Sequence, residues 1–502
     1  MSNCTPYSYH TFVFPFIWNN NGKVKREKFE KCLHENWVLD ERKDDPVDPL
    51  LYSQYCYFNQ SARNIIFTEK GETSPRVRNY RFDCGKWLND SSWLESPKGE
   101  ENPIRYIIEK KIKEEDFKAS LRVNGIRLRL FDSGVGMIVY ELENYEFNDE
   151  RSIKRINEYG RRIFAPYLDN EKGCSLCADR ITLQYPKDYI GWDFAGTYEG
   201  LLRNSEIRYA EIITALLKNG TRCAVTTPKA ERNNFYIEPI IDDRMFVICA
   251  WVNHEFVLPM KEYSEGEYRY LSDALKYPPD HEDNAARRLY ELVFVDGNGV
   301  SCYSRTMLHD MLKTHIYDRW LECGTITGMS EYSFFTVSDF PATINAHLMD
   351  YTEMAMLVLA QRASLLAFER QLGDCIKDQM DSEQLRQDYV TFQSEYLLSE
   401  VSPQQQGIEL YIMLLGMMRI QEEKADVDHE IEALYASDDA KQEKKTQGFL
   451  NWLTVLGFAD IVISCCTFFF EEYNWWVHLL PVAAVIGCIG WGWFLSRKRK
   501  KK

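Results

Sequence analysis

Two apolar segments close to the C-terminal end constrain this 502-residue chain more than any other feature. Residues 449–470 contain one charged side chain, Asp460, and residues 477–495 contain no acidic or basic side chain apart from His478. A helix of the first segment would be about 33 Å long, enough to cross a bilayer. The sequence therefore predicts a transmembrane hairpin over 449–502, and the alternative is a helical pair buried in a protein core.

Basic residues predict the orientation of this hairpin. Lys441, Lys444 and Lys445 precede the first segment, the basic tail 497–502 follows the second, and the connection 471–476 has no Lys or Arg. Positive residues favour the cytoplasmic side, so both termini are expected in the cytoplasm of a multi-pass inner-membrane protein. The polar N-terminus lacks the apolar core of a signal peptide. The net charge of −16 argues against direct nucleic-acid binding.

The rest of the chain divides into two parts by pattern. Residues 1–340 alternate short apolar runs with turns and predict a mixed α/β domain with strands at 12–18, 245–252 and 289–295 and a hairpin at 122–142. Residues 341–448 predict long helices at 343–379, 382–398 and 404–436. Leading into a membrane segment, they suggest an oligomeric stalk, and an antiparallel bundle within one subunit is the alternative.

The first apolar segment has one more polar side, formed by Thr454, Gly457, Asp460, Ser464 and Thr467. A carboxylate within a bilayer needs water, an ion or a partner, so these residues would line a cation pore formed by several subunits. The alternative is a protonated Asp460 that hydrogen-bonds another helix. Glu471, Glu472 and Asn474 would lie at the external mouth of the pore.

This layout resembles the CorA family of divalent-cation channels, in which a cytoplasmic α/β domain leads through a long stalk helix into two spans and a basic tail. The resemblance covers about residues 343–502 and implies a CorA-like homo-oligomer, a pentamer, that contacts membrane lipid and conducts a divalent cation. One departure is clear, because the family carries Gly-Met-Asn at the outer end of the first span and residues 468–474 here read FFFEEYN.

A narrower resemblance is carried by residues 7–18, 128–136 and 156–164, which read YSYHTFVFPFIW, LRLFDSGVG and INEYGRRIF. These stretches are similar to the CorA-like proteins associated with type III CRISPR systems. That resemblance implies an antiviral membrane effector, gated when a nucleotide second messenger, S-adenosylmethionine joined to AMP, binds the cytoplasmic domain. The alternative is a constitutive, magnesium-type channel or transporter.

Candidate ligand-binding residues fall in the first part of the chain. Arg127 and Arg129 share one face of a predicted strand, and Arg161 and Arg162 end a predicted helix, so either pair could hold a phosphodiester. The aromatic side chains that share one strand face could stack on adenine, namely Phe12, Phe14, Phe16 and Trp18. The alternatives are arginines that stabilise a helix end and an aromatic face that belongs to the core.

The sequence shows no motif of an enzyme. A glycine-rich phosphate loop, a nucleophile elbow and a His-Glu-x-x-His helix are all absent. Cys174 and Cys177 have the spacing of zinc ligands, but no second pair accompanies them, so buried or surface thiols are expected and no metal site is assigned. We therefore expect a non-enzymatic protein without a resident cofactor.

Overall fold

The computed structural model describes residues 5–18, 25–31, 33–42, 49–69, 71, 75–83, 104–112, 115–163, 177–184, 189–193, 211–214, 216, 222–223, 236–242, 244–297, 299–378 and 382–469. The chain divides into two units, Met1–Asp428 and His429–Lys502.

The strands of the described residues are β1 (Ser8–Ile17), β2 (Trp37–Leu39), β3 (Glu41–Arg42), β4 (Thr68–Glu69), β5 (Val77–Phe82), β6 (Arg105–Lys110), β7 (Phe117–Phe131), β8 (Val135–Asn144), β9 (Arg180–Gln184), β10 (Tyr189–Asp193), β11 (Arg222–Cys223), β12 (Tyr236–Pro239), β13 (Phe246–Trp251), β14 (Tyr263–Ser264), β15 (Glu267–Tyr268), β16 (Ile316–Tyr317), β17 (Thr325–Met329) and β18 (Ser333–Ser338).

The helices are α1 (Arg26–Glu30), α2 (Pro49–Tyr57), α3 (Gln60–Ile66), α5 (Glu150–Gly160), α8 (Glu211–Thr214), α9 (His254–Met260), α10 (Arg269–Lys276), α11 (Ala285–Val293), α12 (Arg305–His315), the 3-10 helix η3 (Leu321–Cys323), α13 (Pro341–Ala346), the π-helix η4 (His347–Tyr351), α14 (Thr352–Asp378), α15 (Ser382–Tyr396), α16 (Gln405–Met417) and α17 (Ile420–Phe469).

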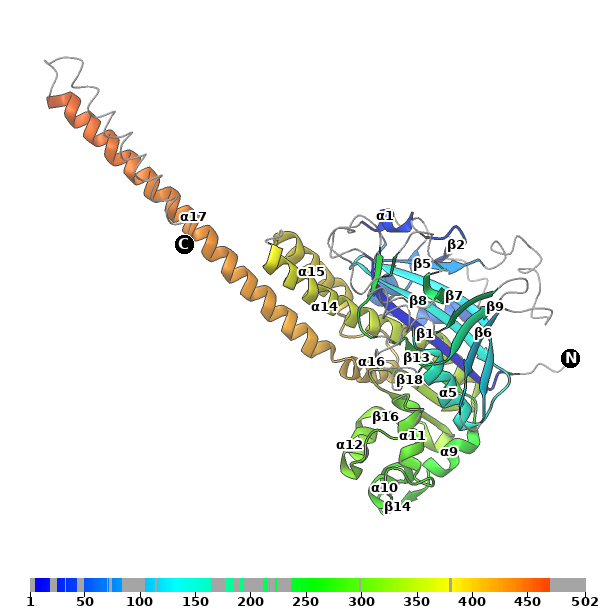
Figure 1. Cartoon of the computed structure of the whole chain (residues 1–502). Coiled ribbons are helices and arrows are strands. Elements are labelled where there is room, and N and C mark those ends of the chain that lie inside the picture. The colour runs from blue at the N-terminus through cyan, green and yellow to red at the C-terminus, as the bar shows by residue number, and fades with distance from the viewer. Residues whose placement is uncertain are drawn as a thin grey trace. The chain divides into compact units, whose positions relative to one another are not determined.

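A 14-stranded sheet organises the first unit (Figure 1). Its main path runs β10-β9-β6-β7-β8-β1-β13-β18-β17-β16, and along this path only β13 and β18 pair in parallel. The 15-residue β7 pairs with β8 along one edge, and its two halves pair with β6 and β5 along the other. Gly134 has φ +91°, a left-handed conformation that suits glycine and closes the β7–β8 hairpin. The predicted hairpin at 122–142 is thus confirmed.

Both faces of the central strands are covered. On β7 the side chains of Ile126, Leu128 and Leu130 belong to the large apolar core that also contains residues of α5 and α11. Arg127 and Arg129 alternate with them and point to the opposite face, where they meet α14. This two-sided burial explains why the central strands are almost entirely buried.

A group of short helices, α9 to α12, lies at one end of the unit (Figure 1). Asn253, Asn284 and Ser304 accept hydrogen bonds from backbone N–H groups at the starts of α9, α11 and α12. The run 289–295, predicted as a strand, is instead the second half of α11 and the residues after it. The Asn284 cap favours this outcome, because it satisfies two backbone N–H groups at the start of a helix.

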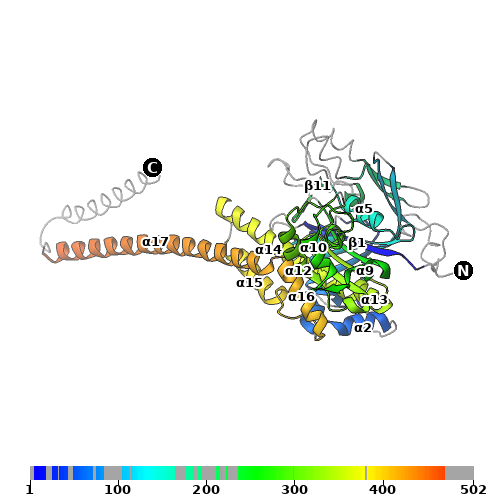
Figure 2. The ribbon, with the colours of Figure 1, turned by 90° about the horizontal axis from the view of Figure 1, so that it is seen from below.

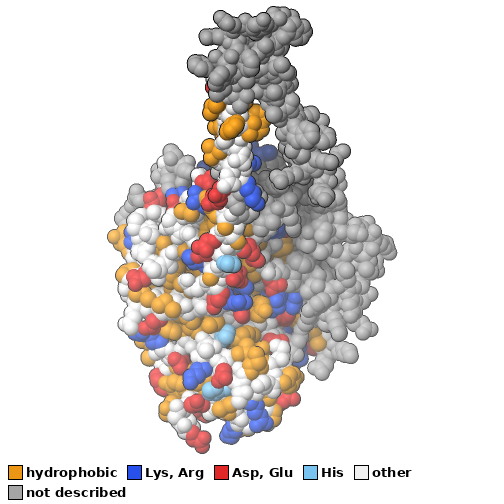
Figure 3. Space-filling view, turned by 90° about the vertical axis from the view of Figure 1, so that its left-hand side faces the viewer, with side chains coloured by type: hydrophobic (Ala, Val, Ile, Leu, Met, Phe, Trp, Pro, Cys, Tyr) orange, Lys and Arg blue, Asp and Glu red, His pale blue; other side chains and the backbone are white. Residues whose placement is uncertain are grey.

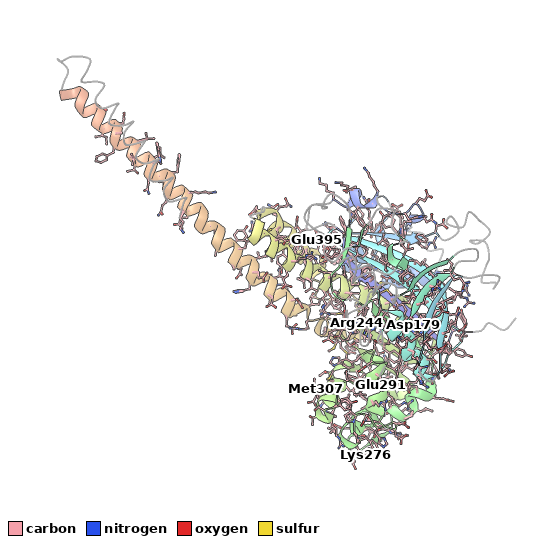
Figure 4. The ribbon with its side chains drawn as sticks, viewed as in Figure 1. Asp179, Arg244, Lys276, Glu291, Met307 and Glu395 are labelled. Carbon is pink, nitrogen blue, oxygen red and sulfur yellow. The ribbon has the colours of Figure 1, made fainter. Side chains whose placement is uncertain are left out.

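The helices predicted at 343–379 and 382–398 correspond to α13, η4 and α14 and to α15, and they pack within the first unit and do not form a free stalk. The helix predicted at 404–436 is divided at Met418 and Arg419 into α16 and the start of α17. Residues 354–360 of α14 are all buried, which is possible only for a helix covered on every side. Gln361 donates to the Tyr396 carbonyl over 2.6 Å, and the rings of Phe368 and Phe392 lie 5.3 Å apart, so α15 runs antiparallel to α14. Glu395 of α15, labelled in Figure 4, forms an ion pair with Arg76.

Helix α17 corrects the predicted membrane architecture. Among the described residues, no helix is both long enough and apolar enough to cross a bilayer. Residues 420–448 of this 50-residue helix are rich in charged side chains, and Asn451 and Asp460 interrupt the apolar run that follows. The predicted CorA-like fold with a transmembrane hairpin, the multi-pass inner-membrane location and the ion channel are contradicted by this finding. The predicted span 477–495 lies outside the described residues.

The described part of the second unit is the helical segment 429–469. Apolar side chains gather toward its end, as the orange atoms of Figure 3 show. Those that are exposed are Phe449, Leu450, Trp452, Leu453, Val455, Leu456, Phe458 and Ile461.

We predict that Glu353→Ala lowers the free energy of unfolding by about 3–5 kcal/mol, because the guanidinium of Arg129 would lose its carboxylate partner in a buried position. Equilibrium unfolding in urea measures the change. The control is Glu262→Ala, which breaks an exposed pair with Arg269 and should cost less than about 1 kcal/mol. Equal losses for the two variants would contradict the assignment.

Candidate functional site

The aromatic residues predicted to stack on a ligand belong to the core. Phe12 and Phe14 are 0% exposed and Trp18 is 2% exposed. Phe12 packs against Tyr106, and Trp18 packs against Phe29 and donates its indole N–H to the Val135 carbonyl over 3.0 Å. Their rings are therefore covered by protein, and none of them presents a face to a ligand.

Arg127 and Arg129 are paired inside the protein. Arg127 donates to one oxygen of Glu353 over 2.9 Å and also pairs with Glu141, while Arg129 donates to the other oxygen of Glu353. Burial alone would raise the pKa of Glu353, but the two guanidinium groups hold it below its usual range. This ion-pair network joins α14 to the sheet and leaves little charge for an incoming phosphate.

Arg161 and Arg162 lie on the other side of the sheet, at the C-terminal end of α5. Both donate to the carboxylate of Glu158, over 2.8 and 3.0 Å, and Arg161 also donates to the Val295 carbonyl over 3.0 Å. Cations at a helix C-terminus are stabilised by the helix dipole. The structure therefore does not bring the two predicted arginine pairs together.

A third arginine joins this second pair. The backbone of Arg244, in the segment before β13, forms an isolated antiparallel β-bridge with the backbone of Arg162. Its guanidinium donates a hydrogen bond to the carboxylate of Asp242. Its guanidinium lies 4.6 Å from the ring centroid of Tyr332, and that of Arg161 lies 5.8 Å from the same ring. Figure 4 labels Arg244 between the strands and α11, which carries Glu291. We name Arg161, Arg162 and Arg244 the arginine cluster.

Arg161 is the least satisfied member of the arginine cluster. It is 1% exposed, and within the part of the chain that the structure describes its Nε and Nη1 atoms have no hydrogen-bond partner. Burial lowers the pKa of Arg161, and so do the positive charges of Arg244 and Arg162, although Glu158 opposes them. Tyr332, at 36% exposed, and the partly exposed Arg244 form the accessible side. Such a group of guanidiniums can hold an anion.

Sequence reasoning missed Arg244 and Tyr332. They are separated from Arg161 by long stretches of chain, and neither lies in a pattern that indicates a ligand. Strands β13 and β18 pair with each other, and the start of β13 lies beside the C-terminal end of α5. This pairing brings Arg244 and Tyr332 to the arginine cluster.

The predicted pore residues fall on α17. Thr454, Gly457, Asp460 and Ser464 are exposed, and Thr467 is part of the helix, although its side chain is not described. The predicted mouth residues Glu471, Glu472 and Asn474 lie outside the described residues, as does Cys174. Cys177 is buried. Within the described part of the chain, no group of three His, Cys, Asp or Glu side chains could hold a metal ion.

Buried polar side chains around His10 are linked to one another by hydrogen bonds. Its Nε2 atom lies 2.8 Å from Ser8 Oγ, and its Nδ1 atom lies 2.7 Å from Asn157 Oδ1. Cys249 interacts with the same Asn157, so the residue types resemble those of a thiol nucleophile. However, burial raises the pKa of the Cys249 thiol to about 12 and lowers that of His10 to about 4. The thiol is inert and these hydrogen-bonded side chains are structural.

Comparison with protein-family models finds no match, and neither does comparison with curated proteins or with solved structures. The homo-oligomer, the absence of enzymatic activity and the absence of direct nucleic-acid binding stay predictions.

We predict that His10 makes the protein acid-sensitive. Because the pKa of His10 is about 4 when folded and about 6.5 when unfolded, the unfolded chain binds the extra proton between these values. Stability should therefore fall as the pH drops from about 6.5 to 4, by about 3 kcal/mol from this residue. In His10→Asn, unfolding measured across this range should show a shallower slope. An unchanged slope would contradict the assignment.

Proposed function

We propose that the unit Met1–Asp428 is a sensor that binds a phosphodiester-containing nucleotide at the arginine cluster. The carrying observation is that three arginines lie together and that the buried Nε and Nη1 atoms of Arg161 have no hydrogen-bond partner among the described residues. A guanidinium donates charge-assisted hydrogen bonds to a phosphate, and neighbouring arginines can donate to the same phosphate group.

The surroundings of Arg161 support an anionic ligand. Burial lowers the pKa of Arg161, and the positive charges of nearby Arg244 and Arg162 lower it further. Arg244 and Tyr332 would meet the ligand first, because they are partly exposed.

The nucleotide that we propose is S-adenosylmethionine joined to AMP, the messenger implied by the resemblance to CorA-like proteins of type III CRISPR systems. This conjugate carries a phosphate group that the arginine cluster can hold. The proposal therefore places the protein in antiviral defence as the receptor of a second messenger.

The test is calorimetric titration of the full-length chain with the S-adenosylmethionine–AMP conjugate. We expect Arg244→Ala to weaken binding about thirtyfold, since one charge-assisted hydrogen bond contributes about 2 kcal/mol. The matched control is Arg288→Ala, because Arg288 is also partly exposed, pairs with Glu150 and lies 4.9 Å from the ring centroid of Phe256. The control should bind as the parent chain does.

Two outcomes would overturn the proposal. One is the absence of binding by the parent chain to the conjugate. The other is an equal affinity of the parent chain and Arg244→Ala, which would place the ligand elsewhere.

A further inference from the structure

The π-helix η4 carries several polar side chains on the face of the sheet opposite the arginine cluster. It lies between α13 and α14, and π-helical turns are rare and often occur at functional sites. His347, at its start, is fully buried and packs against Phe334 of β18. Asp350 and Tyr351, at its end, are partly exposed.

Helix α2 supplies an aromatic wall beside η4. Gln54 donates to the Met349 carbonyl over 2.9 Å, which holds the two segments together. The rings of Tyr57 and Tyr351 lie 6.4 Å apart at an angle of 62°. Figure 2 shows α2 next to α13 and α16. On α16, a Cβ atom at Gly407 would lie 2.5 Å from Tyr57 Oη, so glycine permits this close approach.

Asp350 has no positive partner beside these rings. Its Oδ1 atom is buried and has no hydrogen-bond partner among the described residues, and the same is true of Tyr57 Oη. Across the described residues, no Lys, Arg or His side chain forms an ion pair with Asp350. Arg127 and Arg129 belong to the ion-pair network of Glu353, and both are bound to that carboxylate.

The groups that face Asp350 add no positive charge either. Burial raises the pKa of Asp350 to about 7, and the charge of Glu353 raises it further in the same direction. Tyr57 and Tyr351 are neutral, since burial raises the pKa of each. Burial lowers the pKa of His347 to about 3, so its imidazole is neutral as well. Among the described residues, the groups beside Asp350 therefore carry no positive charge.

We propose that Asp350, Tyr57 and Tyr351 form a binding site for an organic cation that carries an ammonium group. A carboxylate supplies the opposite charge, and tyrosine rings attract a cation through their faces. A metal ion is a poorer fit, because it requires several oxygen ligands and Asp350 is the one carboxylate without a partner in this group. The site is independent of the arginine cluster.

The test uses tetramethylammonium chloride, with sodium chloride at equal concentration as the reference. At pH 8, tetramethylammonium should raise the melting temperature of the full-length chain by a few degrees more than sodium does, because a bound ligand stabilises the folded state. In Asp350→Asn this difference should disappear. Asp388→Asn, which changes an exposed carboxylate on α15, should keep it.

A pH series adds a second readout. Because the pKa of Asp350 is raised from 3.8 to about 7 in the fold, the unfolded chain gives up this proton first, and its carboxyl group lowers the stability as the pH rises from about 4 to about 7. Asp350→Asn should therefore melt higher than the parent chain at pH 8 and no higher at pH 4, which also shows that the variant folds. The apparent affinity of the parent chain for tetramethylammonium, taken from the melting-temperature shift, should be at least tenfold lower at pH 5.5 than at pH 8.

Three results would overturn this proposal. The first is an equal effect of tetramethylammonium and sodium on the parent chain. The second is a tetramethylammonium effect that persists in Asp350→Asn, and the third is an effect that does not change with pH. None of these bears on nucleotide binding at the arginine cluster, so the two proposals fail separately.

Discussion

The buried carboxylate of Glu353 is the interaction on which the first unit depends. It is bound by Arg127 and Arg129, whose side chains point away from the main apolar core. Removing three charged groups from water is costly, and each group is stabilised only while the others stay in place. This requirement sets the position of α14 on the sheet and makes residues 352–378 part of the folded unit.

The same carboxylate explains the charge at η4. Asp350 lies less than one helical turn before Glu353, yet both arginines are bound to Glu353 and none reaches Asp350. On the other face, Glu158 is shared by Arg161 and Arg162, so part of Arg161 stays without a partner. The two faces thus differ in their local charge, and at these two places we propose that charged ligands bind.

Local structure was largely predictable. The aromatic alternation of β1, the β7–β8 turn at Gly134 and the helices from α13 to α16 follow from periodicity and turn residues. The run 289–295 was misjudged because a short apolar run is ambiguous between strand and helix, and the Asn284 cap decides it. The membrane hairpin was inferred from the apolar length of two segments and from the charged and aromatic residues that flank them, and no described helix meets the requirement for a span.

The sequence by itself determined which faces of strands and helices are apolar, because side-chain periodicity repeats over neighbouring residues. It also indicated that Arg127 and Arg129 share a face. Only the tertiary structure decided that their partner is Glu353, more than two hundred residues later, and that Arg244 joins Arg161 instead. Charge neutralisation is a property of distances in space, and a chain can bring the same arginine to a carboxylate or to a ligand without any change in its local pattern.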